Sequence, residues 1–274
     1  MIVVTGATGN VGRPLVQALV SAGETVTAVS RKASAAGLPS GVRSVDADLG
    51  EPVTLRAALD GAEALFLLLS GDLLAAGDPS GILRLAREAG IRRVVYLSSQ
   101  GVATGRHPGQ MEETLAVSGM ESTVLRPAGF HSNTVLWAET VRSGRKVVAP
   151  FGDVALPTVD PADIAEVAAA ALRDPAHVGA TYELTGPAPI SPRQQAAAIG
   201  QALGEPVRFV EQTGAQAREQ MLGFMPEPVV EATLGILGTP SDAEQRVSPD
   251  VERILGRPAR PFADWAARNV AAFR

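Results

Sequence analysis

The first half of the chain alternates short apolar runs with segments of helical spacing. The apolar runs predict strands at about 2–5, 25–30, 42–46, 64–69 and 93–98. Between them, apolar residues recur every three or four positions, as at Leu15, Ala18 and Leu19, and again over 53–59 and 82–89. This alternation is typical of an α/β protein with a doubly wound parallel sheet, the Rossmann fold.

The second half continues with mixed elements and has no linker, repeat or low-complexity segment. A strand is expected over 181–184, and helices over 160–172, over 196–203 after a capping box at Ser191, from Pro228 onward and near the end of the chain. We interpret the carboxylates of Asp160 and Asp163, at the start of the first of these helices, as structural.

Three glycines spaced three residues apart follow the first strand and lead directly into the first helix. Gly6 permits a tight turn, Gly9 lets the backbone approach a pyrophosphate, and Gly12 lets the helix pack closely on the strand. The first amides of that helix then face the phosphates. In this context the pattern predicts a dinucleotide-binding turn, and the alternative is an ordinary connection between a strand and a helix.

The end of the second strand indicates which dinucleotide is bound. Sites that prefer NAD place an Asp or Glu there to bind the ribose hydroxyl, whereas this chain has Arg31 and Lys32. Both cations suit a 2′-phosphate, so NADPH is the expected cofactor; the alternative is a pair of exposed surface cations. By topology, the residues beside the adenosine are those that end the third and fourth strands, namely Asp46, Asp48, Leu68, Leu69 and Ser70.

Composition excludes several other classes of function. The formal net charge is −5 and no basic cluster exceeds two residues, so neither nucleic acid nor an anionic membrane is an expected partner. The chain has no cysteine, which excludes disulfides, thiolate metal sites and cysteine nucleophiles. The three histidines have no metal-ligand spacing, so no metal site is expected. No targeting segment is evident, and we expect a cytoplasmic monomer or homodimer.

Several motifs together resemble those of a known family. They are Thr5-Gly6-Ala7-Thr8-Gly9-Asn10-Val11-Gly12, Asp48-Leu49, Leu97-Ser98-Ser99, Leu125-Arg126-Pro127, Asp160-Pro161-Ala162-Asp163-Ile164-Ala165 and Tyr182-Glu183-Leu184-Thr185-Gly186. In these motifs, which span most of the chain, the protein resembles the short-chain dehydrogenase/reductase superfamily. The match is to its atypical NmrA-like branch, with NAD(P)H-dependent quinone- and azoreductase-like members.

The resemblance implies a set of site residues. Thr8, Gly9, Asn10 and Val11 would hold the pyrophosphate, Arg31 the adenosine phosphate, and Pro127, Ala128 and Phe130 the nicotinamide. The further residues expected to bind the cofactor are Gly6, Lys32, Asp48, Leu49, Leu68, Leu69 and Ser98. Ser99 would lie near the reacting carbonyl, and Gln100 would contact the substrate.

One departure from the family pattern bears on the chemistry. Most of the superfamily uses a Tyr-x-x-x-Lys pair as proton donor, but no tyrosine or lysine occurs between Leu97 and Gly144. Ser99 and His131 are the expected substitutes, with His107 and Glu112 as weaker candidates. The alternatives are that Ser99 only turns the chain and that His131 is a buried, hydrogen-bonded histidine.

The resulting hypothesis is an NADPH-dependent reductase of a bulky apolar ketone or quinone, including polycyclic aromatic compounds. Residues 1–150 are expected to form the NADP-binding core, and 151–274 to complete the sheet and form the substrate pocket and lid within one compact unit. Phe224 and Met225 are the expected substrate contacts, although such a segment also suits a core. The alternative function is a non-catalytic sensor of NADP(H) that regulates a partner. A nucleotide-sugar epimerase is disfavoured, because those relatives also rely on the tyrosine.

Overall fold

The computed structural model describes residues 1–69, 73 and 80–274, which form two compact units. The first unit comprises Met1–Val102, Pro108–Pro127 and Pro161–Glu183, and the second comprises Ala103–His107, Ala128–Asp160 and Leu184–Arg274. The expected boundary at residue 150 coincides with neither unit. The reason is that the helix beginning at Pro161 returns to the first sheet after the chain has already contributed residues 128–160 to the second unit.

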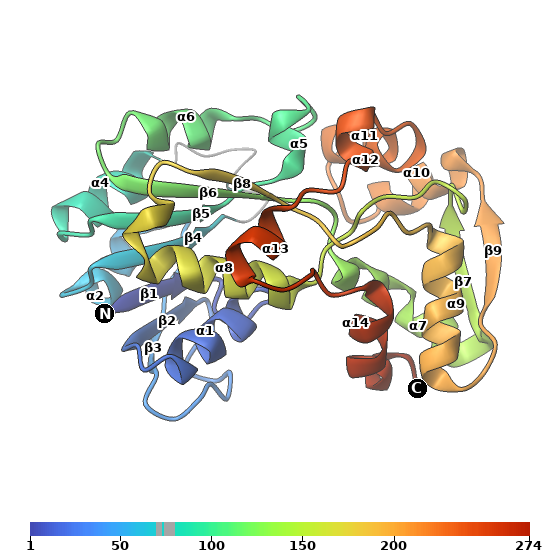
Figure 1. Ribbon diagram of the computed structural model, residues 1–274, viewed down its shortest axis with the longest axis horizontal. Coiled ribbons are helices and arrows are strands. Elements are labelled where there is room, and N and C mark those ends of the chain that lie inside the picture. The colour runs from blue at the N-terminus through green and yellow to red at the C-terminus, as the bar shows by residue number, and fades with distance from the viewer. Residues whose placement is uncertain (70–72, 74–79) are drawn as a thin grey trace. The chain divides into compact units, whose positions relative to one another are not determined.

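A seven-stranded sheet forms the centre of the first unit (Figure 1). Its strand order is β3-β2-β1-β4-β5-β6-β8, and the pairings from β3 through β6 are all parallel. The strands are β1 (Ile2–Thr5), β2 (Val26–Ser30), β3 (Arg43–Asp46), β4 (Ala64–Leu68), β5 (Arg93–Leu97), β6 (Glu121–Pro127) and β8 (Thr181–Leu184). The first five predicted strands are confirmed to within one residue at each end, and the Rossmann fold is confirmed with them.

The burial of the strands explains why they were visible in the sequence. All four residues of β1 are buried, as are the first four of β4, because helices cover the central strands on both faces. The edge strand β3 is largely exposed and carries charged residues instead. An apolar run therefore marks a central strand of this sheet.

Helices cover both faces of the sheet. On one face α1 packs against α8. On the other face the strands share a core with α2, α4 and α6, in which Tyr96 is buried. The helices of this unit are α1 (Gly12–Ser21), η1 (Pro52–Leu55), α2 (Arg56–Leu59), α4 (Ser80–Glu88), α5 (Gln100–Ala103), α6 (Gln110–Ala116), α8 (Pro161–Arg173) and η3 (Pro175–His177).

The second unit has its own small parallel sheet, in which β7 (Lys146–Pro150) pairs with β9 (Arg208–Gln212). Its core joins this sheet to α7, α9, α14 and η4. The predicted capping box of α9 is confirmed, because Ser191 and Gln194 exchange hydrogen bonds. The helices are η2 (His131–Trp137), α7 (Ala138–Gly144), α9 (Pro192–Leu203), α10 (Gly214–Leu222), α11 (Glu227–Gly238), α12 (Asp242–Gln245), α13 (Asp250–Leu255), α14 (Phe262–Arg268) and η4 (Val270–Phe273).

Candidate functional site

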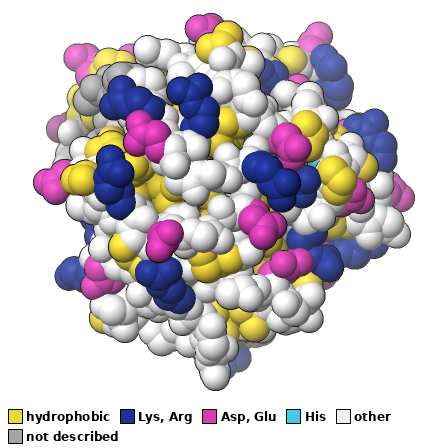
Figure 2. Space-filling view, turned by 90° about the vertical axis from the view of Figure 1, so that its left-hand side faces the viewer, with side chains coloured by type: hydrophobic (Ala, Val, Ile, Leu, Met, Phe, Trp, Pro, Cys, Tyr) yellow, Lys and Arg dark blue, Asp and Glu magenta, His cyan; other side chains and the backbone are white. Residues whose placement is uncertain are grey.

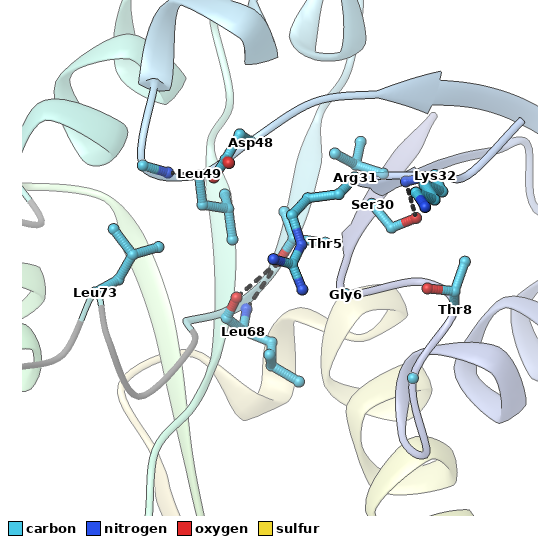
Figure 3. A pocket seen from close by; sticks show the side chains of 13 residues that line it. Thr5, Gly6, Thr8, Ser30, Arg31, Lys32, Asp48, Leu49, Leu68 and Leu73 are labelled. Carbon is cyan, nitrogen blue, oxygen red and sulfur yellow. Dashed lines mark hydrogen bonds between the residues drawn. The ribbon is translucent and has the colours of Figure 1, made fainter. Parts of the chain in front are cut away.

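A cavity of about 890 Å³ lies in the first unit, where the strand order reverses between β1 and β4. Carboxyl ends of parallel strands on either side of such a reversal form the crevice in which doubly wound sheets bind ligands. The cavity is lined by Thr5, Gly6, Thr8, Gly9, Val29, Ser30, Arg31, Lys32, Asp48, Leu49, Gly50, Leu68 and Leu73 (Figure 3). Eight of these residues were expected at the cofactor: Gly6, Thr8, Gly9, Arg31, Lys32, Asp48, Leu49 and Leu68.

The three glycines have different environments. Gly6 has φ +63°, a left-handed conformation that favours glycine. A Cβ at Gly12 would lie 2.1 Å from the carbonyl oxygen of Gly6, so only glycine fits between α1 and the turn. A Cβ at Gly9 would have one near neighbour, that same oxygen at 3.3 Å. Gly9 therefore leaves its backbone open to the cavity, as a pyrophosphate requires.

The beginning of α1 is suited to bind an anion. Val11 is its N-cap residue and provides no side-chain acceptor, and no acidic residue lies in the first turn. No carboxylate at the N-cap or in the first turn therefore competes for the first amides of the helix, which favours a bound phosphate. Val11 is buried and Asn10 is exposed; neither is among the described residues that line the cavity.

Thr5 joins β1 to β4, the two strands that flank the crevice, by side-chain hydrogen bonds. Its hydroxyl donates to the carbonyl oxygen of Phe66 at 3.0 Å and accepts from the amide of Leu68 at 2.9 Å. The side chain of Leu68 lies against Gly6, 3.3 Å from where a Cβ would stand. Thr5 was not among the residues expected at the cofactor, although its place at the end of β1 was a usable signal.

Arg31 and Lys32 follow β2 and are both exposed at the cavity. Arg31 extends toward the middle of the cavity in Figure 3. Within the described part of the chain, neither side chain pairs with a carboxylate. Two cations without an internal counter-charge are the arrangement expected for a phosphate site.

The carboxylates at the end of β3 have different environments. Asp48 lines the cavity, and its Oδ1 accepts a hydrogen bond from the amide of Gly50 at 2.9 Å. Asp46 bonds instead to Ser34 in the loop after β2. At the end of β4, Leu69 packs in the core, and Ser70 lies outside the described residues.

Ser98 belongs to a polar cluster at the ends of β5 and β6. Its hydroxyl donates to Glu112 at 2.5 Å, and Glu112 also accepts two hydrogen bonds from the guanidinium of Arg126. These bonds raise the pKa of Arg126 above its usual value. Burial raises the pKa of the neighbouring Tyr96 to about 12, so that phenol stays protonated at neutral pH. Glu112, a weaker catalytic candidate, therefore has a structural contact to both Ser98 and Arg126.

Ser99 directly precedes the short helix α5, which begins at Gln100. The hydroxyl of Ser99 accepts a hydrogen bond from the amide of Gly101 at 3.1 Å, and Gln100 is buried. Ser99 thus turns the chain after β5, which is the alternative to a role at the substrate. Its side chain is half-buried. Its expected role near a carbonyl stays a prediction.

His131 lies in the second unit and is 1% exposed. Its Nδ1 is 3.0 Å from the hydroxyl of Thr158, and its Nε2 is 3.4 Å from the carbonyl oxygen of Arg260. Phe262 packs edge-on against the ring. These contacts favour the alternative of a buried, hydrogen-bonded histidine, and a role as proton donor stays a prediction.

The residues expected at the nicotinamide are divided between the units. Pro127 ends β6 in the first unit, whereas Ala128 and Phe130 belong to the second. There the amide of Ala128 donates to Leu184, and Phe130 forms a bridge with Val159. Their contact with a cofactor stays a prediction.

Phe224 and Met225 connect α10 to α11, which pack against each other. Phe224 is 57% exposed, and along α11 only Val230 is buried although the helix is strongly apolar. Phe151, whose φ of +55° is unusual for a side chain of this size, lies so close to Gly238 that a Cβ there would be 2.6 Å from its ring. Val230 and Gly238 therefore pack within the second unit, whereas Phe224, in the connection before α11, presents apolar surface.

Three further features concern the surface, the helices and the titratable side chains of the described residues. On the face drawn in Figure 2, Lys and Arg side chains are interspersed with Asp and Glu side chains. Among residues 1–69, 73 and 80–274, no helix is long and apolar enough to cross a membrane. The same residues contain no group of three His, Asp or Glu side chains that could hold a metal ion.

Comparison with known proteins places these features in a family. A family model described as NAD(P)H-binding matches residues 6–175. All of the chain aligns with 99% of a (4-alkanoyl-5-oxo-2,5-dihydrofuran-3-yl)methyl phosphate reductase of Streptomyces griseus at 37% identity. It also aligns over its full length with 99% of the NAD(P)H azoreductase of Xenophilus azovorans, at 34% identity.

A solved structure has the same fold. The NADPH-dependent quinone oxidoreductase of Escherichia coli, complexed with NADPH, superposes with a TM-score of 0.79 over 98% of this chain and 99% of that one, at 23% identity. The family model covers more than half of the chain, and the cavity holds the glycine turn at the crevice that such a family uses. The chain therefore belongs to the NAD(P)H-binding family and, like its two full-length relatives, is an NAD(P)H-dependent oxidoreductase.

Proposed function

We propose that this protein is an NADPH-preferring reductase that delivers a hydride to a bulky, largely apolar ketone or quinone, including polycyclic aromatic ones. The observation that carries the cofactor preference is the pair of cations, Arg31 and Lys32, at a cavity that the glycine turn also lines. Gly9 and the uncapped start of α1 fit a pyrophosphate, and the two cations fit a 2′-phosphate.

Arg31→Ala is expected to weaken NADPH binding and to leave NADH binding nearly unchanged. The lost hydrogen bonds to a charged phosphate are worth about 1.5–3 kcal/mol. Isothermal titration of both cofactors against wild type and variant measures this difference. Arg84→Ala removes an exposed cation from α4 in the same unit and serves as the control. Equal affinities of the wild type for NADPH and NADH would overturn the proposed preference.

The substrate class is inferred from the connection between α10 and α11. It offers exposed apolar side chains, whereas a charged substrate would require a convergent set of polar groups. The two full-length relatives support an acceptor that is conjugated, since one is an azoreductase and the other reduces a (4-alkanoyl-5-oxo-2,5-dihydrofuran-3-yl)methyl phosphate. The second substrate carries a phosphate, so the relatives support the conjugated group and not the absence of charge.

Phe224→Ala and Met225→Ala are expected to raise the KM for a quinone by about 10–200-fold, the effect of losing 1–3 kcal/mol of apolar contact, while the KM for NADPH stays constant. Steady-state rates at varied quinone and varied NADPH separate the two constants. Val117→Ala, which truncates an 84% exposed valine in the first unit, is the matched control. If both substrate-side variants match this control, α10 and α11 do not form the substrate lid.

The proposed chemistry does without the superfamily's tyrosine and lysine. NADPH, when bound, supplies the hydride. A positioned general acid contributes about 10²–10⁴-fold, so an acceptor that is already polarised, such as a quinone, needs the acid less. Ser99 is proposed to orient the acceptor oxygen, His131 to assist weakly, and water to provide the proton.

Turnover tests the proposal as a whole. NADPH oxidation is measured against a panel of quinones and polycyclic ketones, with NADPH binding measured on the same preparation. Oxidation by at least one apolar member of the panel is the expected result. If NADPH binds tightly but no quinone or ketone of the panel oxidises it, the proposed substrate class is overturned and an NADP(H)-sensing regulator is favoured.

A further inference from the structure

The loop that carries Arg31 and Lys32 is fastened to neighbouring elements of the first unit. At its start, the hydroxyl of Ser30 accepts a hydrogen bond from the amide of Lys32 at 3.3 Å. Ala33, the next residue, is 1% exposed and anchors the loop by its methyl group. The backbone that carries the two cations therefore lies between a turn at Ser30 and a buried alanine.

Asp46 holds the loop from the end of β3. Its Oδ1 accepts from the amide of Ser34 at 2.9 Å, and its Oδ2 accepts from the Ser34 hydroxyl at 2.6 Å. These hydrogen bonds lower the pKa of Asp46 below its usual value, so the carboxylate is ionised at neutral pH. Ser34 thus engages both oxygens of this carboxylate.

Arg13 holds the loop from the opposite side. It stands in the first turn of α1, directly after Gly12, and its Nη2 donates to the carbonyl oxygen of Ala36 at 3.0 Å. The loop after β2 is therefore held at Ser34 by Asp46 at the end of β3 and at Ala36 by Arg13 of α1, the helix that follows the glycine turn. This arrangement links the place of Arg31 and Lys32 to the place of the pyrophosphate site.

We propose that Ser34 and Asp46, supported by Arg13, are positioning residues that set the preference for a 2′-phosphate. Asp46 pairs in register with Ser30 at the end of β2, close to where NAD-preferring sites use a carboxylate on the ribose. Here Ser34 engages that carboxylate, and the negative charge orders the cationic loop instead of binding a ribose hydroxyl. The inference rests on the proposed NADPH preference and assigns it to residues that do not themselves line the cavity.

Two physical roles of Asp46 predict opposite effects of its removal on the affinity for NADPH. If Asp46 acted only as a negative charge near the phosphate, its removal would tighten NADPH binding by relieving repulsion. If Asp46 instead holds the loop through Ser34, an arrangement that we call the clamp, Asp46→Ala frees the loop and weakens NADPH binding. Asp46→Asn keeps one acceptor oxygen while losing the charge, so under the clamp it is expected to fall between wild type and Asp46→Ala.

The test compares the dissociation constants of NADPH, NADH, 2′,5′-ADP and 5′-AMP for wild type, Ser34→Ala, Ser34→Thr, Asp46→Ala, Asp46→Asn and Arg13→Ala. Ser34→Ala and Asp46→Ala are expected to weaken NADPH and 2′,5′-ADP by about tenfold, the scale of one hydrogen bond to a charged group, and to change NADH and 5′-AMP by less than about twofold. Ser34→Thr keeps the hydroxyl and is expected to bind all four ligands as the wild type does. Asp60→Asn removes an exposed carboxylate elsewhere in the unit and is the charge control.

The outcomes distinguish a failure of the clamp from a failure of the proposed NADPH preference. A wild type that does not prefer NADPH would overturn the proposed function. A wild type that prefers NADPH, with Asp46→Ala binding it equally or more tightly, would overturn the clamp. An equal loss of affinity for NADPH and for NADH would also overturn the clamp, since a general disturbance of the site is not selective. If Asp46→Ala does not fold, Arg13→Ala repeats the test, because it frees the loop from α1.

Discussion

Gly12→Ala is expected to weaken NADPH binding by about 100-fold or more, because two or more hydrogen bonds to the phosphates are misplaced together. It is also expected to lower the free energy of unfolding by about 3 kcal/mol, the upper part of the range for overpacking. The added Cβ would stand 2.1 Å from the Gly6 carbonyl oxygen and 2.7 Å from the Ala7 Cα. Both neighbours are backbone atoms, so the strain is relieved only by moving α1 away from β1.

Gly9→Ala is the matched control for this prediction. Its Cβ would be 3.3 Å from the Gly6 oxygen and otherwise unopposed, so the free energy of unfolding should change by less than about 0.5 kcal/mol. Binding should still weaken, because the methyl group occupies the approach to the pyrophosphate. Urea unfolding and NADPH titration on both variants give the two readouts. Unchanged stability of Gly12→Ala would contradict the close packing of α1 on the turn.

Glu112→Ala is expected to lower the free energy of unfolding by about 3 kcal/mol, the cost of leaving one partner of a buried ion pair uncompensated. The Glu112 and Arg126 side chains are 13% and 24% exposed, so solvent screens them little. The same variant also removes the acceptor of the Ser98 hydroxyl. Thermal and urea unfolding measure the loss.

Two further variants make this prediction specific. Glu113→Ala removes the adjacent, exposed carboxylate of α6 and should change stability by less than about 0.5 kcal/mol. Adding Arg126→Leu to Glu112→Ala removes the uncompensated charge and should recover part of the loss. A Glu112→Ala variant as stable as Glu113→Ala would show that the pair contributes nothing to folding.

Local signals in the sequence predicted most of the sheet and much of the cofactor cavity. Apolar runs marked the central strands, and the glycine spacing marked Gly6, Gly9 and Gly12, because each of these features is set by neighbours along the chain. Asp48 and Leu68 were found by topology, since parallel strands end at one edge of a sheet.

Contacts between distant segments were not predictable in the same way. Asp46 was placed beside the adenosine, yet it bonds to Ser34, and no spacing rule indicates that pairing. Glu112 and Arg126 lie 14 residues apart on different elements, so neither residue type signalled an ion pair. His131 was singled out because histidine titrates near neutral pH, whereas its burial against Phe262 depends on a helix more than a hundred residues later.

The interleaving of the two units has a consequence for how the protein is made. The chain passes between them after residues 102, 107, 127, 160 and 183, so neither unit corresponds to one continuous stretch. During synthesis the first sheet lacks α8 and β8 until residue 184 has left the ribosome, and the apolar face that α8 covers is exposed until then. A nascent chain of this design depends on its last strand to close its first sheet, which makes translation pauses before residue 184 the period of greatest exposure to aggregation and proteolysis.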